Sequence, residues 1–366
     1  MKNAMTRVDT HAHLFRGIDG IPDLNRIARD LGFSGMVIAG IPRREIGNHN
    51  PAALAAKARR PEFYYCFAGL DHSAKFTGGR VTTPSLAAQA ETLAALGADG
   101  FKLIESKPTL RRELGEPVDG PYYAAFFARV ETLGLPLLWH TADPEEFWDP
   151  AATPAWAASR GWAYGPGWLP KERHYAETEA VLARHPRLRV IFPHFYFLSA
   201  DLPRAGAFLA RFPNVFLDLA PGVELIFTLG ANRDAARDFF VRHADRIVFG
   251  TDIGIIPEAT VSENVHRARL VTRFLETDEE FGHDPEADFV LEPLPGARAR
   301  GLALPPAALE KIYSGNFRAI AGAAPRVFDR ARAREECRRL AGVFDALPGE
   351  KTPALHPARA AEMMEA

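Results

Sequence analysis

Two histidines one residue apart, His11 and His13, stand in the first apolar segment of the chain. Residues 8–15 are expected to form a strand, and side chains alternate between the two faces of a strand, so both imidazoles would point the same way. Two imidazoles on one face can bind one metal ion. By itself the pair is equally compatible with two ordinary core or surface histidines, so the hypothesis needs support from other parts of the chain.

Three later apolar segments each end in a residue of a kind that binds metals. Residues 135–140 end in His140, residues 188–194 in His194, and residues 246–252 in Asp252. A parallel strand that is buried on both faces is nearly all apolar, so a polar residue at its end is conspicuous. In an α/β barrel the catalytic groups lie at the carboxyl ends of several strands. We therefore expect these side chains to meet His11 and His13 at one site, where their nitrogen and oxygen donors suit Zn²⁺, Mn²⁺ or Fe²⁺.

The chain alternates apolar strand-like runs with helical patterns, which is typical of repeated βα units and a parallel sheet. Eight strands are expected, at residues 8–15, 35–40, 62–68, 99–104, 135–140, 188–194, 214–219 and 246–252. Helices are expected at residues 22–31, 84–96, 122–133, 175–184, 202–211, 233–243, 305–321 and 329–344. Eight strands in order are the number in a (β/α)₈ barrel. The predicted fold class is α/β, a distorted (β/α)₈ (TIM) barrel with an insertion after the fifth strand and extra C-terminal helices.

Residues 1–349 are expected to form a single domain with two insertions, at 141–171 and 276–300, followed by a C-terminal tail at 350–366. All five tryptophans lie between Trp139 and Trp168. A long segment that follows a strand end belongs on the active-site face, and the first insertion is interpreted as a partial lid that excludes water. The alternative is a small satellite core under a long loop. The tail from Pro348 is expected to be mobile or to pack on a partner.

Composition narrows the class of protein. The chain has 366 residues, of which 47% are hydrophobic, and its net charge of −2 gives no support for binding nucleic acid or an anionic membrane surface. No apolar run is long enough to span a bilayer, and no signal peptide is evident, so a cytoplasmic enzyme is expected. The two cysteines, Cys66 and Cys337, form neither a disulfide framework nor a zinc cluster. A nucleophile elbow, a P-loop and a dinucleotide fingerprint are all missing.

The residues at the strand ends resemble those of the amidohydrolase superfamily, in particular its second large branch of metal-dependent TIM-barrel proteins. That branch, amidohydrolase-2, includes hydrolases, lactonases, and the aminocarboxymuconate-semialdehyde and resorcylate decarboxylases. The resemblance runs from Asp9 to about Asn316. It implies one divalent metal ion, most simply Zn²⁺, bound by His11, His13, His140 and Asp252. It also implies that His194 is either a further metal ligand or the residue that polarises the water or protonates the substrate.

Asp252, next to both metal and water, is the expected proton acceptor, and the water would then attack an acyl carbon. Lys102 has three interpretations. In binuclear relatives a carboxylated lysine on the fourth strand bridges two metals, whereas in the second branch a basic residue there often stays unmodified and meets a substrate anion. A lysine held by a salt bridge near the barrel mouth is a third possibility, and a mononuclear site is expected.

Tyr196 and Asp218 are expected to contact the substrate, or else to be structural, with Asp218 orienting a neighbour such as His194.

The leading functional hypothesis is a metal-dependent hydrolase that cleaves an amide, ester or lactone of a small molecule. The alternative is a metal-dependent, non-oxidative decarboxylase of an aromatic or muconate-type acid, in which His194 or Asp252 handles the proton. A catalytically inactive barrel that serves as a binding protein is the third interpretation, and the filled site positions argue against it. The expected partners are a small-molecule substrate and a second copy in a homodimer, with no nucleic acid and no membrane. The histidines His72, His174, His185 and His243 are expected at the surface.

Overall fold

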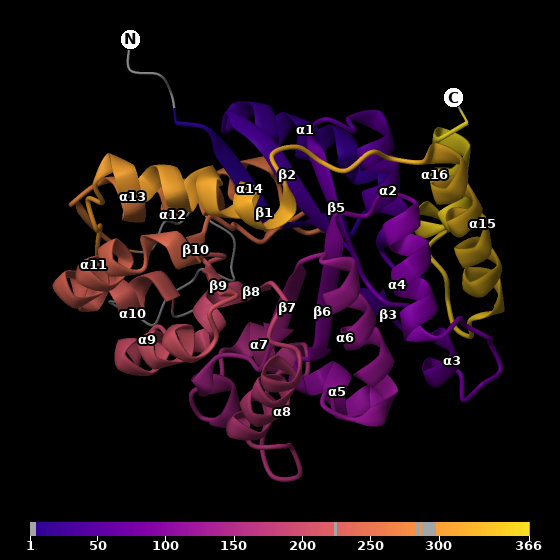
Figure 1. Ribbon diagram of the computed structural model, residues 1–366, viewed down its shortest axis with the longest axis horizontal. Helices are drawn as coiled ribbons and strands as arrows, with labels where there is room; N and C mark the ends of the chain where they lie inside the picture. Colours follow the sequence, from indigo (N-terminus) through magenta and orange to yellow (C-terminus); the bar gives the residue numbers. More distant parts are fainter. Residues whose placement is uncertain (1–4, 223–224, 283–285, 287–297, 366) are drawn as a thin grey trace.

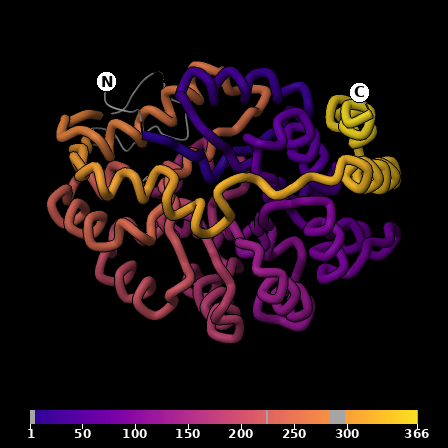
Figure 2. Tube along the Cα trace, turned by 45° about the horizontal axis from the view of Figure 1, so that its top comes forward, coloured from indigo at the N-terminus to yellow at the C-terminus, as the bar shows by residue number. Residues whose placement is uncertain are grey.

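The sheet of this protein curls into a barrel. The computed structural model describes residues 5–222, 225–282, 286 and 298–365. Within these residues nine strands form one sheet in the order β10-β9-β8-β7-β6-β5-β2-β1-β11, and its neighbouring strands are parallel. Helices surround the strands (Figures 1 and 2). The predicted α/β class and distorted barrel are confirmed.

The strands of the barrel are β1 (Arg7–His13), β2 (Phe33–Ala39), β5 (Tyr64–Ala68), β6 (Gly100–Ser106), β7 (Leu137–Thr141), β8 (Val190–Phe192), β9 (Val215–Asp218), β10 (Ile247–Val248) and β11 (Ile253–Gly254). Two short antiparallel pairs lie outside it, β3 (Pro42–Arg43) with β4 (Gly47–Asn48) and β12 (Glu280–Phe281) with β13 (Ala299–Arg300). The longer helices are α1 (Ile21–Asp30), α2 (Asn50–Arg59), α4 (Leu86–Ala95), α6 (Pro121–Leu133), α8 (Lys171–Arg184), α9 (Leu202–Arg211), α11 (Arg233–Arg242), α12 (Val261–Glu276) and α15 (Arg330–Ala346). Shorter helices are α3 (Ser73–Phe76), α5 (Pro108–Leu114), α7 (Ala155–Ser159), α10 (Leu225–Ala231), α13 (Pro306–Glu310), α14 (Asn316–Ala321) and α16 (Pro357–Met363).

The predicted eighth strand is interrupted. It was expected to run continuously to Asp252, but β10 pairs with β9 and β11 pairs with β1, and residues 249–252 belong to neither strand. The gap is held to β1 by a backbone hydrogen bond from Thr10 N to Phe249 O (2.9 Å). Asp9 reinforces this junction, since its Oδ2 accepts the Thr251 hydroxyl (2.6 Å) and its Oδ1 accepts the Thr251 amide (3.1 Å). The sheet therefore returns to its first strand through a distorted segment.

Two apolar layers follow from the alternation of side chains along the strands. Val37 and Leu138 face an inner cluster that also contains Phe317 and Ile320 of α14. Their strand neighbours, such as Met36 and Leu137, face the larger cluster between the sheet and the helices. Because each strand packs on both faces, its sequence is almost entirely apolar, which is why the strand segments are recognisable in the chain.

The tryptophan-rich insertion forms the predicted satellite core. Its elements are η2 (Glu145–Trp148) and α7, and Phe147, Ala157 and Tyr164 form a separate small core with four tryptophans packed around it. The satellite core is therefore present. One edge of the segment, at Trp162, also lines the main cavity of the protein. Its action as a lid stays a prediction. Most of the second insertion, 283–285 and 287–297, lies outside the described residues.

The C-terminal tail, which was expected to be mobile or to pack on a partner, packs on its own chain. Residues 353–355 form a short helix, η7 (Pro353–Leu355), which contacts η1 (Gly17–Gly20) near the start of the chain. The last helix, α16, packs on α15 and α2, and Figure 1 shows α15 and α16 together at one side of the barrel. Among the described residues no helix is both long and apolar enough to cross a membrane.

A buried ion pair ties three segments together at the amino end of β6. The Lys57 ammonium lies 2.5 Å from Asp99 Oδ2, and both side chains are fully buried. Asp99 Oδ2 also accepts the Cys66 amide (2.7 Å), and Oδ1 accepts the Arg326 amide (2.6 Å). The Lys57–Asp99 pair matters for stability, because a buried charge that loses its partner has no water to solvate it.

We expect Asp99→Asn to lower the free energy of unfolding by ~3–5 kcal/mol, since it leaves the Lys57 ammonium buried without a counter-ion. Urea denaturation followed by circular dichroism would measure the change. The matched control is Glu172→Gln, which neutralises the exposed bidentate pair of Glu172 with Arg204 (2.8 and 2.7 Å). That control should change stability by less than ~1 kcal/mol. Equal effects of the two substitutions would contradict this account of the buried pair.

Candidate metal centre

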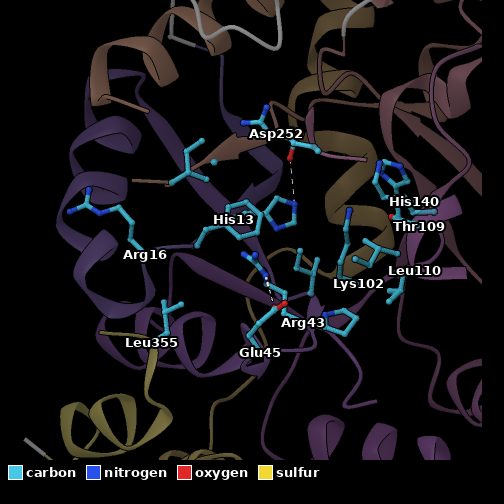
Figure 3. A pocket seen from close by; sticks show the side chains of 18 of the residues that line it. His13, Arg16, Arg43, Glu45, Lys102, Thr109, Leu110, His140, Asp252 and Leu355 are labelled. Atoms are coloured by element: carbon cyan, nitrogen blue, oxygen red, sulfur yellow. Dashed lines mark ion pairs between the residues drawn. The ribbon is translucent and has the colours of Figure 1, made fainter. Parts of the chain in front are cut away.

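Three donor atoms converge at the carboxyl ends of the strands. His11 Nε2 lies 3.1 Å from His13 Nε2, and each of these nitrogens lies 3.4 Å from Asp252 Oδ1. All three atoms fall within 4.8 Å of one another, a spacing that one metal ion can bridge. Figure 3 shows Asp252 close to His13. The two histidines come from β1, and Asp252 comes from the interruption between β10 and β11.

The backbone around this cluster departs from regular strand geometry. The register of β1 against β2 shifts between Asp9 and Ala12, so Val8 packs in the inner cluster while Ala12 packs in the outer one. A strict two-residue alternation would put both on the same face. Asp252 has a φ of 52°, which few non-glycine residues adopt. These irregularities, which are common next to active sites, direct the three donors toward one point.

The second nitrogen of each histidine fixes which nitrogen can bind a metal. His11 Nδ1 lies 2.9 Å from Asp218 Oδ2, and His13 Nδ1 lies 2.7 Å from the Ala39 carbonyl oxygen. A carbonyl oxygen only accepts hydrogen bonds, so His13 Nδ1 carries the proton, and the buried Asp218 carboxylate assigns His11 in the same way. The Nε2 lone pairs therefore face each other and a carboxylate oxygen. Three electron-rich atoms at this spacing repel one another unless a cation lies between them, so the donor set fits a divalent metal ion.

Burial and neighbouring charges set the protonation states that metal binding needs. Burial lowers the pKa of His13 to about 4 and holds the pKa of His11 well below its usual value. Burial also raises the pKa of Asp252, but the nearby His11 and Arg267 outweigh it and hold that pKa well below the usual range. At neutral pH the imidazoles are thus neutral and the carboxylate is ionised, which is the ligand state of these groups.

His140 and His194 flank the cluster, but their ring nitrogens are not among the three donor atoms that converge. The ring centroid of His194 lies 5.6 Å from that of His11 and 5.1 Å from that of His140. His140 Nε2 is held by the Ala142 carbonyl (2.9 Å) and Asp143 Oδ1 (3.1 Å), which leaves Nδ1 as its other nitrogen. His194 Nδ1 is held by the Ala220 carbonyl (3.0 Å), which leaves Nε2. Ligation of a metal by His140 and His194 stays a prediction.

A left-handed turn follows β8 and explains the position of Tyr196. Residues 194–197 all have positive φ, between 51° and 57°, so the strand ends at Phe192 and the alternation expected from a continuing strand does not apply. Tyr196 turns away from the cavity and packs on Tyr175, Phe192 and Phe208 in the core. Tyr196 therefore does not line the cavity, and of its two predicted roles its contacts fit the structural one.

Asp218 supports the site through hydrogen bonds and does not line the cavity. It is fully buried, and its Oδ2 accepts His11 Nδ1 while its Oδ1 accepts the His194 amide (2.8 Å) and the Ala220 amide (2.9 Å). Burial raises the pKa of Asp218 to about 6, and these donors and the His194 charge oppose the rise. Asp218 is not among the residues that line the cavity. The alternative, that it orients neighbouring histidines, agrees with its contacts.

Lys102 lies at the centre of the site. Its Nζ is 3.0 Å from His11 Nε2, the side chain is buried, and burial lowers its pKa to about 8 against the opposing effects of Asp252 and Asp218. No carboxylate holds it in a salt bridge among the described residues, which argues against the purely structural interpretation. A bridging role and contact with a substrate anion both stay open.

A cavity of about 1080 Å³ opens over the donor cluster. Its floor contains the predicted residues His11, His13, Lys102, His140, His194 and Asp252, which therefore share one space. Phe15 stacks on His13 with 5.0 Å between ring centroids and begins an apolar wall. Figure 3 shows Lys102 and His140 on one side of His13 and Arg16 and Leu355 on the other.

Sequence reasoning missed Arg267 and Asp143. Arg267 is buried on α12, donates from Nε to the Thr251 carbonyl (2.7 Å), and lies 3.5 Å from Asp252 Oδ2. It occurs at helical spacing among apolar residues such as Val271, and a cation on an apolar helix face was the available signal. Asp143 is contacted by Lys107 (2.5 Å), Tyr164 (2.5 Å) and His140, but nothing in its local sequence distinguishes it from a loop residue.

Two histidines expected at the surface are buried. His72 Nε2 donates to Glu105 Oε1 (2.8 Å), with both side chains fully buried, and His174 lies beside Trp148. Tertiary contacts bury these two histidines. Glu105 on β6 covers His72 and the tryptophan-rich insertion covers His174, and neither neighbour is close in sequence. His185 and His243 are half-buried.

Comparisons with known proteins agree with this geometry. A family model described as Amidohydrolase matches residues 8–320. No significant match was found among curated proteins. Among solved structures, an amidohydrolase from Burkholderia multivorans with bound zinc is 15% identical, with a TM-score of 0.51 over 87% of this chain and 100% of that one.

Two further structures resemble the chain in fold. A TIM-barrel protein from Bordetella bronchiseptica is 18% identical, with a TM-score of 0.50 over 90% of this chain and 99% of that one. The 2,6-dihydroxybenzoate decarboxylase from Rhizobium is 17% identical, with a TM-score of 0.50 over 87% of this chain and 98% of that one. These identities support the shared fold alone. The family match spans the barrel and every residue of the candidate metal centre, and the chain belongs to the amidohydrolase family.

Proposed function

We propose that this protein is a metal-dependent hydrolase that cleaves an amide, ester or lactone bond in a small molecule. The observation that carries the proposal is the convergence of His11 Nε2, His13 Nε2 and Asp252 Oδ1, with each Nδ1 engaged by an acceptor. His11, His13 and Asp252 would hold the ion, with His140 and His194 beside them. Zn²⁺ suits this donor set, as do Mn²⁺ and Fe²⁺. A divalent ion there would act as a Lewis acid and lower the pKa of a water molecule toward neutrality.

The surrounding side chains have separate parts in the reaction. Asp252 is ionised and is the proton acceptor for the attacking water, while Arg267 holds its second oxygen at 3.5 Å. His194 Nδ1–H donates to the Ala220 carbonyl, so the neutral ring presents the Nε2 lone pair to the cavity, where it would accept a proton and then, as the cation, polarise the scissile carbonyl or protonate the leaving group. Lys102 adds a positive charge where negative charge develops on the substrate oxygen.

The second candidate is a non-oxidative decarboxylase acting on an aromatic or muconate-type acid. Lys102 favours it, because a buried ammonium next to the donor cluster would gain a counter-ion from a substrate carboxylate. His194 or Asp252 would then move the proton to the carbon that loses carbon dioxide. A homodimer and a cytoplasmic location remain predictions, which sedimentation and cell fractionation would test.

Isotope labelling separates the two reactions. We expect the zinc-loaded protein, screened with esters, amides, lactones and aromatic acids in H₂¹⁸O, to place ¹⁸O in the acid product of a cleaved acyl compound. In D₂O, decarboxylation would instead release carbon dioxide and leave deuterium on the product carbon. Mass spectrometry of the products reads both. Carbon dioxide release without acyl cleavage would decide for the decarboxylase.

Metal content should depend on the two β1 histidines. We expect about one equivalent of Zn²⁺, Mn²⁺ or Fe²⁺ per chain in protein purified without chelator, and a loss of metal and turnover together in His11→Ala and His13→Ala. Inductively coupled plasma mass spectrometry measures the metal. His185→Ala is the matched control, since His185 is a half-buried histidine that contacts Glu131 outside the cavity. Near two equivalents would point to a carboxylated Lys102 that bridges two ions. Full metal content in His11→Ala would overturn the site.

Asp218 should act through the histidines it holds. We expect Asp218→Asn to weaken metal binding roughly 10- to 100-fold, because the amide no longer provides a carboxylate for His11 Nδ1. A competition titration with a fluorescent zinc chelator would give the affinity. Asp234→Asn, at an exposed carboxylate on α11, should leave the affinity unchanged. An unaltered affinity in Asp218→Asn would show that Asp218 has a structural role only.

A further inference from the structure

Asp143 contacts three side chains that come from three different segments around the cavity. It follows β7, three residues beyond His140, and is buried. Its Oδ1 accepts His140 Nε2 (3.1 Å), its Oδ2 accepts the Tyr164 hydroxyl (2.5 Å), and the Lys107 ammonium contacts both oxygens (2.5 and 2.7 Å). A carboxylate has about four acceptor positions, so the protein itself uses all of them here.

The backbone after β7 brings Asp143 back to His140. Ala142 has a φ of 61°, in the left-handed region that few non-glycine residues adopt, and its amide donates to the Ser106 carbonyl on β6 (3.1 Å). The Ala142 carbonyl and Asp143 Oδ1 both contact His140 Nε2. Because a carbonyl oxygen only accepts hydrogen bonds, Nε2 carries the proton, and the neutral His140 ring can offer only Nδ1 to a metal ion.

Tyr164 connects Asp143 to the satellite core. Its ring packs on Trp148 and on Trp168, with 4.8 Å between ring centroids in each pair. The ring is buried in this apolar cluster, while its hydroxyl donates to Asp143. The satellite core is therefore attached to the residue that orients His140.

Lys107 makes a second connection between Asp143 and the insertion. It precedes α5, lines the cavity, and its ammonium lies 4.1 Å from the centroid of the Trp162 ring, which lines the same cavity. A cation over the face of a tryptophan is attracted to it. Figure 3 shows His140 on the side of the cavity where Thr109 of α5 lies. The carboxylate of Asp143 thus holds both His140 and the cation that contacts Trp162.

We infer that Asp143 is a positioning residue that couples the docking of the satellite core on the barrel to the orientation of His140. The inference rests on the proposed function, in which His140 lies beside the metal ion. With the satellite core docked, Tyr164 and Lys107 fix the carboxylate, and the carboxylate fixes His140 with Nδ1 free for a metal. Thermodynamic linkage makes the effect reciprocal, so metal binding through His140 strengthens the docking of the satellite core.

Tyr164→Phe tests the coupling, because it removes one hydroxyl and leaves the ring in the satellite core. We expect the zinc affinity, measured by competition with a fluorescent chelator, to fall roughly threefold to tenfold in Tyr164→Phe and roughly 10- to 100-fold in Asp143→Ala. Tyr313→Phe is the matched control. The Tyr313 hydroxyl also donates to a carboxylate, Glu276 (2.6 Å), but neither residue lines the cavity, so the affinity should stay unchanged.

Hydrogen exchange followed by mass spectrometry gives a readout that a merely structural role would not move. Zinc loading should slow amide exchange in residues 145–168 of the original protein, roughly threefold to tenfold, and Tyr164→Phe should lose this protection. Exchange in α15, which does not line the cavity, should be the same with and without zinc.

Two results would overturn the inference while the metal centre stands. One is a zinc affinity in Tyr164→Phe equal to that of the original protein, which decides the matter even if Asp143→Ala does not fold. The other is faster exchange of residues 145–168 in Tyr164→Phe with the zinc-dependent protection intact, which would make the hydroxyl structural only. If the original protein binds no zinc, the metal centre fails, and the inference fails with it.

Discussion

The active centre depends on the hydrogen bonds that engage both Nδ1 nitrogens of the His11–His13 pair. Asp218 and the Ala39 carbonyl take up these two nitrogens, so both Nε2 lone pairs point at one space that Asp252 also enters. Burial keeps the imidazoles neutral and removes the water that would otherwise separate them. Three converging electron donors repel one another unless a cation is close, so the contacts that assign the tautomers also form a donor set that fits a divalent metal ion.

Asp218 links this arrangement to His194. One of its oxygens accepts a hydrogen bond from His11, and the other accepts the amide of His194, where the chain leaves β8 in a left-handed turn. A single buried carboxylate thereby fixes the positions of two histidines that line the cavity. Asp9 has a corresponding role where the sheet closes. It accepts two hydrogen bonds from Thr251 and so holds the interruption between β10 and β11, which contains Asp252, against β1. Rigid attachment of this kind keeps the donors in position before a metal or substrate arrives.

The cavity combines this polar floor with walls from distant parts of the chain. Trp162 comes from the insertion after β7, and Leu355 comes from the segment after α15. Barrel enzymes diversify in this manner, with one set of strand ends for the chemistry and variable segments for the choice of substrate. The family match covers the strand ends and Trp162 and ends before Leu355.

The order of strands and the positions of His11, His13, His140, His194 and Asp252 at their ends were predictable from the sequence, because parallel strands buried on both faces are apolar runs in which a terminal polar residue stands out. The tertiary structure alone decided what those residues contact. Tyr196 faces the core because a left-handed turn breaks the alternation after Phe192, and Asp218 lies beneath the site with all its oxygens occupied. Arg267 and Leu355 reach the site from segments far along the chain. Local patterns report which residues are buried, whereas backbone irregularities and long-range packing set the direction in which each side chain points.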